Sequence, residues 1–401
     1  MSIRTFLFSL LPLFFLTACQ KTSTLKEVEA IFSEVKKEYA PDKRVALFNL
    51  ELKDTAPSIT ISGTTNLPEA KQLFLKRLSD RGVKYEDQIR LLPDSVLGQK
   101  TYGLVNVSVC NIRTQPGHSQ ELSTQSLLGT PLRILEQKEN WYRVQTPDQY
   151  IAWLDHGGFV RVSETTYKEW ISAPKVIYVN DFGFSFESPD IRSQKISDLV
   201  AGNLLKSVGI KNGFLKVEYP DGREAYVPKN ELVNFDSWLA SRSPTPENIL
   251  ATAQEFLGRP YLWGGTSGKG MDCSGFTKSV FYLNGIQLER DASQQVNAGK
   301  LIETDPTLQN ALPGDLLFFG RKATETKKER ITHVGIYMGQ GLFIHASGDA
   351  GVKIESLVPG VANFNEDRLK SFVKAKRLLE SIGDRGIEQL AKHGAYNPSK
   401  L

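Results

Sequence analysis

The sequence predicts an α+β chain of several domains, the last of which carries the chemistry. At 401 residues the chain exceeds one ordinary domain, and roughly 150 residues per domain gives about three. Helical periodicity near the N-terminus gives way to short alternating runs from about residue 102 to 235, and then to mixed patterns up to about residue 380. The formal net charge is +4, and the one basic stretch is 321–330, which argues against a nucleic-acid-binding protein.

The first residues have the pattern of an export signal. Arg4 precedes an apolar run from Phe6 to Leu16 that is too short for a stable membrane span. The following Leu16-Thr17-Ala18-Cys19 resembles a bacterial lipobox, and Gln20 resembles Gram-negative outer-membrane sorting signals. We therefore expect residues 1–18 to be a lipoprotein signal peptide. The lipid on Cys19 would anchor the protein in the cell envelope, on the periplasmic side of the outer membrane. A plain signal peptide with a chance cysteine is the alternative.

A small α/β unit is predicted over residues 19–100. Residues 24–39 keep a helical period, strand-like stretches follow at 44–52 and 58–62, and a second amphipathic helix covers 68–78. No catalytic motif is recognisable there.

Two small β-barrels are predicted next, at 101–170 and 171–240. Short alternating strands with turn residues recur in both, and Asp221-Gly222 is a hairpin signal. The texture resembles bacterial SH3-like barrels, modules that often accompany wall hydrolases. A mixed α+β domain is expected over 241–380, followed by a polar, peripheral tail over 381–401.

Cys273 stands where a glycine-rich loop gives way to a helix. The stretch 264–270 predicts an exposed loop, and Phe276, Val280 and Leu283 follow at helical spacing. Unsatisfied N–H groups at a helix start favour a thiolate, but the dipole contributes only roughly 0.3–1 kcal/mol, less than one pKa unit. We therefore expect a nucleophilic Cys273 that also needs a nearby imidazolium.

A predicted hairpin supplies the histidines. Strand-like runs flank the turn Gly339-Gln340-Gly341, so Met338 should pair with Leu342 and Gly335 with His345.

His333 is then diagonal to His345 on the same face, with roughly 7–8 Å between their backbones. We assign His333 as the base for Cys273 and His345 as the group that fixes its tautomer. Zinc binding by these three residues is an alternative, although the close spacing of common zinc ligands is missing; no metal or cofactor is expected. Cys110, in a barrel strand, should be a buried apolar residue and not a disulfide partner of Cys273.

Four segments in the last domain resemble those of the NlpC-type cell-wall endopeptidases. The segments are 272–276 (Asp-Cys-Ser-Gly-Phe), 313–316 (Pro-Gly-Asp-Leu), 333–337 (His-Val-Gly-Ile-Tyr) and 345–347 (His-Ala-Ser). The resemblance implies a papain-like core, a Cys/His/His triad and cleavage of γ-D-glutamyl-diamino acid bonds. It also implies an oxyanion site made by the Cys273 N–H with the Tyr261 hydroxyl.

The order of domains resembles one subgroup, the YkfC-like murein peptide endopeptidases with two SH3-like barrels. That resemblance implies that the first barrel borders the catalytic cleft, and that Glu121, Tyr150 and Asp291 bind the free amine of an N-terminal L-Ala. A carboxylate with fixed acceptors suits an ammonium. Three further substrate-binding residues are expected: Trp263, Asp272 and Ser274. Ala292 stands where the subgroup tends to have Ser, which leaves binding of the D-Glu α-carboxylate in doubt.

The sequence therefore predicts a monomeric cysteine endopeptidase for L-Ala-γ-D-Glu-diamino acid peptides, acting in murein peptide recycling or turnover. One alternative is an endopeptidase that cuts stem peptides of the intact wall, with barrels that bind glycan or crosslinked stems. The other is a non-catalytic wall-binding lipoprotein.

Overall fold

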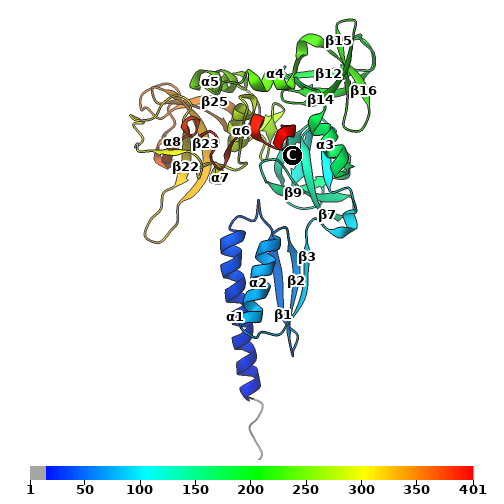
Figure 1. Cartoon of the computed structure of the whole chain (residues 1–401). Helices are drawn as coiled ribbons and strands as arrows, with labels where there is room; N and C mark the ends of the chain where they lie inside the picture. The colour runs from blue at the N-terminus through cyan, green and yellow to red at the C-terminus, as the bar shows by residue number, and fades with distance from the viewer. Residues whose placement is uncertain (1–14, 401) are drawn as a thin grey trace, which may run out of the picture. The chain divides into compact units, whose positions relative to one another are not determined.

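The computed structural model describes the backbone of residues 15–400 and the side chains of residues 24–400. Residues 1–14 of the predicted signal peptide and the side chain of Cys19 lie outside that description. The chain divides into two compact units, Met1–Ser95 and Val96–Leu401, and the mixture of helices and strands confirms the predicted α+β class (Figure 1). Along the described residues, no helix combines the length and hydropathy needed to span a membrane.

The N-terminal unit packs two helices on a three-stranded sheet. Its elements are α1 (Phe15–Tyr39), β1 (Phe48–Asp54), β2 (Ile59–Thr65), α2 (Pro68–Asp80) and β3 (Tyr85–Leu91). β2 pairs antiparallel with β1 and parallel with β3. Val28 and Val35 of α1 and Phe74 of α2 are buried against Ile61 in the sheet. We did not predict β3, because its exposed, charged residues hide the alternation; only Ile89 is buried among them.

The second unit begins with two barrels of the same topology, which we call the first and second barrel. The first consists of β4 (Tyr102–Val105), β5 (Val109–Arg113), β6 (Leu122–Leu127), β7 (Pro131–Lys138), β8 (Trp141–Gln145), β9 (Ile151–Asp155) and β10 (Phe159–Val162). The second consists of β11 (Lys175–Tyr178), β12 (Phe182–Phe186), β13 (Lys195–Val200), β14 (Leu204–Lys211), β15 (Phe214–Glu218), β16 (Glu224–Pro228) and β17 (Leu232–Asn234). The strand orders, β10-β4-β7-β8-β9-β5-β6 and β13-β12-β16-β15-β14-β11-β17, are the same when one is reversed. Helices α3 (Glu164–Ser172) and α4 (Phe235–Ala240) follow the two barrels.

The catalytic domain sets helices against a six-stranded antiparallel sheet of order β21-β26-β22-β23-β24-β25. The sheet strands are β21 (Lys300–Ile302), β22 (Leu316–Arg321), β23 (Arg330–Gly339), β24 (Leu342–Ser347), β25 (Gly351–Ser356) and β26 (Phe372–Arg377). The other elements are α5 (Pro246–Glu255), β18 (Thr266–Ser267), β19 (Gly270–Met271), α6 (Cys273–Leu283), β20 (Ile286–Leu288), α7 (Ala292–Gln295), α8 (Glu366–Ser371) and β27 (Ile387–Gln389). Helix α6 is apolar along most of its length because it is buried: it packs on β23 and β24. That packing brings the start of α6 to the histidine strand.

The C-terminal residues do not form the peripheral tail that we expected. β27 pairs with β20, and Leu390 and Tyr396 are buried with Phe235 and Trp238. The segment, red in Figure 1, thus lies between the catalytic domain and the barrels. The prediction failed because a few well-placed apolar residues in a polar stretch are enough to bury it once a complementary surface is present.

Candidate active site

Cys273 is the first residue of α6 and is buried, with 7% of its surface exposed. Asp272 caps the helix and accepts a hydrogen bond from the Gly275 N–H at 2.7 Å. Cys273 is therefore fixed at a helix start, as the loop-to-helix pattern predicted.

Burial raises the pKa of the Cys273 thiol to about 12, and the neighbouring Asp272 charge acts in the same direction. The backbone N–H of Val334, the charge of Arg290 and the backbone N–H of Ser274 lower the pKa but do not outweigh burial. The helix start alone is too weak to produce a thiolate here, because burial penalises the charged form. Cys273 therefore rests as a thiol, and a base would have to take its proton before it could act as a nucleophile.

The histidine hairpin forms with one difference from the predicted register. Ile336 pairs with Ile344 and Tyr337 with Phe343, so the alignment of Gly335 with His345 holds. Gly339, not Met338, pairs with Leu342, and a bulge absorbs the extra residue.

Gly335 also has a packing reason. A Cβ at this position would lie 3.1 Å from the Cβ of His345 and 2.9 Å from the Phe343 ring. A side chain at position 335 would collide with Phe343 and His345 on the neighbouring strand, which explains why this position is a glycine.

A hydrogen-bond chain fixes the tautomers of both histidines. His333 Nε2 lies 2.7 Å from His345 Nδ1, and His345 Nε2 lies 3.0 Å from Glu355 Oε2. The Glu355 carboxylate can only accept, so His345 carries its proton on Nε2 and accepts at Nδ1. His333 then donates from Nε2, which leaves its Nδ1 lone pair available as the base.

Sequence reasoning did not find Glu355. Burial tends to raise its pKa, but hydrogen bonds from His345 and Lys353 outweigh burial and hold the pKa at about 2. Asn365 Nδ2 donates a further hydrogen bond to Glu355 at 2.7 Å. The carboxylate is therefore ionised and fixed. Its signal in the sequence was an acidic residue at an inward position of a short strand, which no local motif distinguishes.

Both imidazoles are kept neutral. Burial lowers the pKa of His333 well below its usual value, and the Arg368 charge adds to this effect. Burial also lowers the pKa of His345, against the opposing effect of Glu355. A neutral thiol and a neutral imidazole thus form the resting pair, instead of the thiolate and imidazolium that the sequence suggested.

Tyr261 belongs to the same site. Burial raises the pKa of its hydroxyl above the usual range, and the Asp272 carboxylate acts in the same direction. The hydroxyl therefore stays protonated and can donate a hydrogen bond. Together with the Cys273 N–H at the helix start, it has the chemistry of an oxyanion donor.

Asp272 is engaged by the protein itself. Its carboxylate accepts from the Gly264 N–H at 2.9 Å and pairs with Arg290 through bonds of 2.6 and 3.1 Å. Arg290 is 1% exposed and also donates to Ser274 Oγ at 3.0 Å. The geometry assigns Asp272 to positioning of the helix start and loop, whereas substrate binding by Asp272 and Ser274 stays a prediction. Arg290, which sequence reasoning missed, connects Asp272 to the neighbouring Asp291.

The residues expected to bind an amine lie in two pairs. The Tyr150 hydroxyl, from the first barrel, donates to Asp291 Oδ2 at 3.4 Å. The exposed Glu121 accepts from Trp263 Nε1 at 2.7 Å. Asp291 also begins α7, where its N–H donates to Gln294 Oε1 at 3.1 Å. Asp291 therefore has both the capping role and the contact with the barrel.

The first barrel contacts the catalytic loop through backbone. A Cβ on Gly264 would lie 2.2 Å from the Leu122 carbonyl oxygen, and Gly264 has a φ of +79°. The Thr266 N–H donates to Gln125 Oε1 at 3.0 Å, and its hydroxyl donates to the Gln125 carbonyl at 3.0 Å. Glycine at 264 is required by both its conformation and the close approach.

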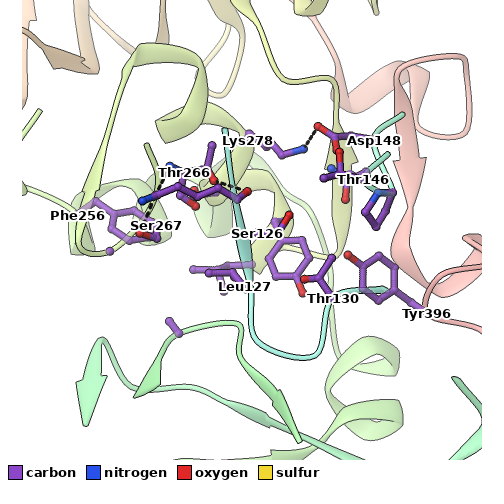
Figure 2. A pocket seen from close by; sticks show the side chains of 18 of the residues that line it. Ser126, Leu127, Thr130, Thr146, Asp148, Phe256, Thr266, Ser267, Lys278 and Tyr396 are labelled. Carbon is purple, nitrogen blue, oxygen red and sulfur yellow. Dashed lines mark hydrogen bonds and ion pairs between the residues drawn. The ribbon is translucent and has the colours of Figure 1, made fainter. Parts of the chain in front are cut away.

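A pocket beside this contact is a junction between parts of the second unit (Figure 2). Residues of both barrels, of α6 and of the C-terminal segment line it, among them Ser126, Ala201, Lys278 and Tyr396. Its lining residues do not include Cys273 or the two histidines. The pocket therefore has no part in the chemistry.

The described residues contain no disulfide between Cys110 and Cys273. Cys110 and Cys273 are both free and buried, and burial raises the pKa of Cys110 to about 12. Between residues 24 and 400, no group of three His, Cys, Asp or Glu side chains is arranged to hold a metal ion.

Comparisons with known proteins agree with this geometry. The model of the NlpC/P60 family matches residues 258–365, and that of the bacterial dipeptidyl-peptidase SH3 domain matches residues 112–158. The γ-D-glutamyl-L-lysine dipeptidyl-peptidase of Bacillus subtilis (strain 168) is 33% identical over 246 residues, which cover 59% of this chain and 75% of the relative. The chain belongs to the NlpC/P60 family. This NlpC/P60 protein is a cysteine peptidase. The comparisons thus confirm the predicted family and the predicted class of enzyme.

Other relatives extend the NlpC/P60 match. Dipeptidyl-peptidase 6 of Lysinibacillus sphaericus is 29% identical over 265 residues, or 63% of this chain and 91% of the relative. The crystal structure of an NlpC/P60 family protein from Bacillus cereus superposes with a TM-score of 0.59 at 23% identity, over 69% of this chain and 99% of that one. At that identity the likeness concerns the fold, and it confirms the predicted NlpC-type catalytic fold with an SH3-like domain.

Proposed function

We propose that this peptidase hydrolyses the γ-D-Glu–diamino acid bond of peptidoglycan-derived peptides that have a free N-terminal L-Ala, in the turnover of murein peptides. One observation carries the proposal: a first-barrel hydroxyl, that of Tyr150, meets a catalytic-domain carboxylate, that of Asp291, beside the Arg290–Asp272 pair. The relatives' names, which specify γ-D-glutamyl-L-lysine dipeptidyl-peptidases, support it.

Acylation follows from the fixed tautomers. The Cys273 sulfur attacks the γ-carbonyl carbon while its proton passes to His333 Nδ1, and the oxyanion accepts from the Cys273 N–H and the Tyr261 hydroxyl. His345 and Glu355 stabilise the imidazolium that forms. The C–N bond then breaks, the proton moves from His333 to the leaving amine, and a thioester remains.

Deacylation uses the same groups in reverse. His333 takes a proton from water, the hydroxyl attacks the thioester, and the proton returns to the Cys273 sulfur as the carbon–sulfur bond breaks. The products are a dipeptide with a free γ-carboxylate and the diamino acid.

The amine specificity rests on Tyr150 and Asp291. An ammonium needs acceptors only, and a carboxylate next to a phenolic oxygen supplies them with a net attraction. An N-acyl group removes the charge and adds bulk at the wall made by the first barrel. The free amine of L-Ala should therefore be required.

Mass-spectrometric digestion of L-Ala-γ-D-Glu-meso-diaminopimelate beside its N-acetylated form tests the proposal. Cleavage of the free peptide alone, lost in Cys273→Ala and weakened in Asp291→Asn, is expected. Equal cleavage of both peptides would favour an enzyme of the intact wall. Turnover by Cys273→Ala would overturn the mechanism, and the absence of any turnover by the wild type would favour a wall-binding role.

We further propose that the chain is a lipoprotein of the cell envelope, anchored through Cys19. The support is the lipobox-like Leu16-Thr17-Ala18-Cys19 alone. Incorporation of labelled fatty acid in cells, lost in Cys19→Ser, is the expected result; equal labelling of both forms would exclude this anchor.

A further inference from the structure

Arg368 carries a charge that the described part of the chain does not pair. The side chain is half-buried on α8, and its guanidinium forms no ion pair or hydrogen bond with any residue of the described range. Its recorded contact is the Phe319 ring, 5.7 Å from the guanidinium carbon. A guanidinium that is partly withdrawn from water and keeps its donors free can bind an anionic ligand.

Arg368 lies beside the catalytic base. Phe319 pairs with His333 across β22 and β23, and their rings are 5.8 Å apart. Burial does most to lower the pKa of His333, and the Arg368 charge adds to this effect. Burial also lowers the pKa of Arg368, against the opposing charges of Glu355 and Asp349. The guanidinium and the His333 imidazole thus lie against the same aromatic ring, that of Phe319.

The tautomer-fixing network also holds α8. Asn365 donates to Glu355 Oε2 at 2.7 Å and accepts from the Arg368 N–H at 2.9 Å. A continuous chain of hydrogen bonds therefore runs from His333 through His345 and Glu355 to the backbone of Arg368. The backbone of Arg368 is therefore held relative to the base, as it would not be on an independent loop.

The proposed reaction indicates which part of the substrate would lie beside His333 and Arg368. His333 protonates the leaving amine, so the residue that carries that amine must lie next to His333. Its α-carboxyl group is attached to the same carbon as the amine and lies within a few ångströms of it. A guanidinium fork binds a carboxylate through two parallel hydrogen bonds, but it binds a neutral amide much more weakly.

We propose that Arg368 binds the free α-carboxylate of the diamino acid that leaves, and so selects peptides that end at this residue over longer stem peptides. The inference rests on the proposed function and adds a specificity on the leaving side of the bond, where Glu121, Tyr150 and Asp291 do not act. In a longer peptide the same carboxyl is an amide and loses the charge that Arg368 recognises.

The test compares L-Ala-γ-D-Glu-L-Lys with its C-terminal carboxamide. Lysine is used because it has no second carboxylate. The wild type should have a kcat/KM about 10- to 100-fold higher for the acid. Arg368→Gln should lower kcat/KM for the acid by that factor and leave the amide within about twofold, which removes the preference.

Two further variants separate binding from indirect effects. Arg368→Lys keeps a positive charge beside His333 without the fork, and it should recover only part of the preference. Lys370→Gln, on the same helix but paired with Glu366 on the surface, should change neither substrate. Thermal unfolding checks that each variant is folded.

Three results would overturn the inference. A wild type that cuts acid and amide equally has no carboxylate recognition. An equal loss for both substrates in Arg368→Gln means that Arg368 acts only through the charge on His333. A wild type that cuts neither peptide contradicts the proposed function itself, and the inference falls with it.

Discussion

The two barrels carry a turn of the same backbone geometry at the same place in the same topology, yet among the described contacts only the turn of the first barrel touches the catalytic domain. Between β8 and β9 the turn is 147–150 (Pro-Asp-Gln-Tyr), and between β15 and β16 it is 220–223 (Pro-Asp-Gly-Arg). Two backbone hydrogen bonds of 2.8 to 3.0 Å close each turn. The third residue, Gln149 or Gly222, has a positive φ in both. The backbone therefore does not distinguish them.

The side chains of the two turns have different partners. Asp148 pairs with Lys278 of α6, and Tyr150 donates to Asp291. The equivalent Asp221 instead pairs with Arg223 at 2.6 Å, within its own turn.

Arg223 in turn donates to the Asn106 carbonyl at 2.8 Å. The second turn thus connects the two barrels, whereas the first contacts the catalytic domain at Lys278 and Asp291. A shared scaffold acquires its role from a few side chains and from the surface that it faces.

The largest effect on catalysis is expected from a substitution of Glu355, which lies outside both turns. Glu355→Gln replaces an acceptor by a group that can donate to His345 Nε2, which moves the His345 proton to Nδ1 and the His333 proton to the nitrogen needed as base. The kcat should fall on the order of 10²- to 10⁴-fold with little change in KM. Steady-state kinetics on the free tripeptide measure this.

Lys353→Met is the matched control for Glu355. It removes an ion-pair partner of Glu355 but keeps the carboxylate, so kcat should stay within about tenfold. Glu355→Gln with kcat within about threefold of the wild type would refute the tautomer assignment.

The next prediction compares the loss of unfolding free energy when the aspartate of each turn, Asp148 or Asp221, is replaced by asparagine. Asp148→Asn leaves Lys278, whose side chain is 13% exposed, without its charged partner, and should lower the free energy of unfolding by about 3 kcal/mol. Asp221→Asn removes a partly exposed pair and should cost about 0–1 kcal/mol. Urea unfolding followed by tryptophan fluorescence measures both. Equal losses would break the comparison, because they would mean that Asp148 serves its own turn alone.

The smallest effect is expected when the last residues of the two turns, Tyr150 and Arg223, are each replaced by the other. Tyr150→Arg removes the acceptor beside Asp291 and adds a like charge against the substrate ammonium. The loss of a charged hydrogen bond, about 1.5–3 kcal/mol, corresponds to a fall in kcat/KM of roughly 10- to 150-fold for the free tripeptide.

The reciprocal Arg223→Tyr should leave kcat/KM unchanged, because Arg223 contacts only barrel groups in the described contacts. Kinetics of both variants with one substrate preparation make the test. A comparable fall in both would show that the barrels affect catalysis through their stability, and not through a wall residue of the first barrel.

Local patterns in the sequence predicted the parts of the site that depend on neighbouring residues. A glycine loop that turns into a helix identified Cys273, and alternation across a short turn identified His333 and His345. The bulge at Met338 was not predictable, because turn geometry depends on positive φ at Gln340 and Gly341 and on the strands that flank them.

Only the tertiary structure decided which distant groups support that site. Glu355, Arg290 and Arg368 are ordinary charged residues in the sequence, and their roles follow from burial against partners that are remote along the chain. The protonation of the thiol was also decided there, since burial of Cys273 outweighs the helix start. The sequence by itself determined the α+β class, the cysteine–histidine chemistry and the repeated barrel texture, because these depend on periodicity and short motifs. Which of two turns with the same backbone geometry contacts the catalytic domain depends on how the barrels pack on that domain, and no local pattern records that packing.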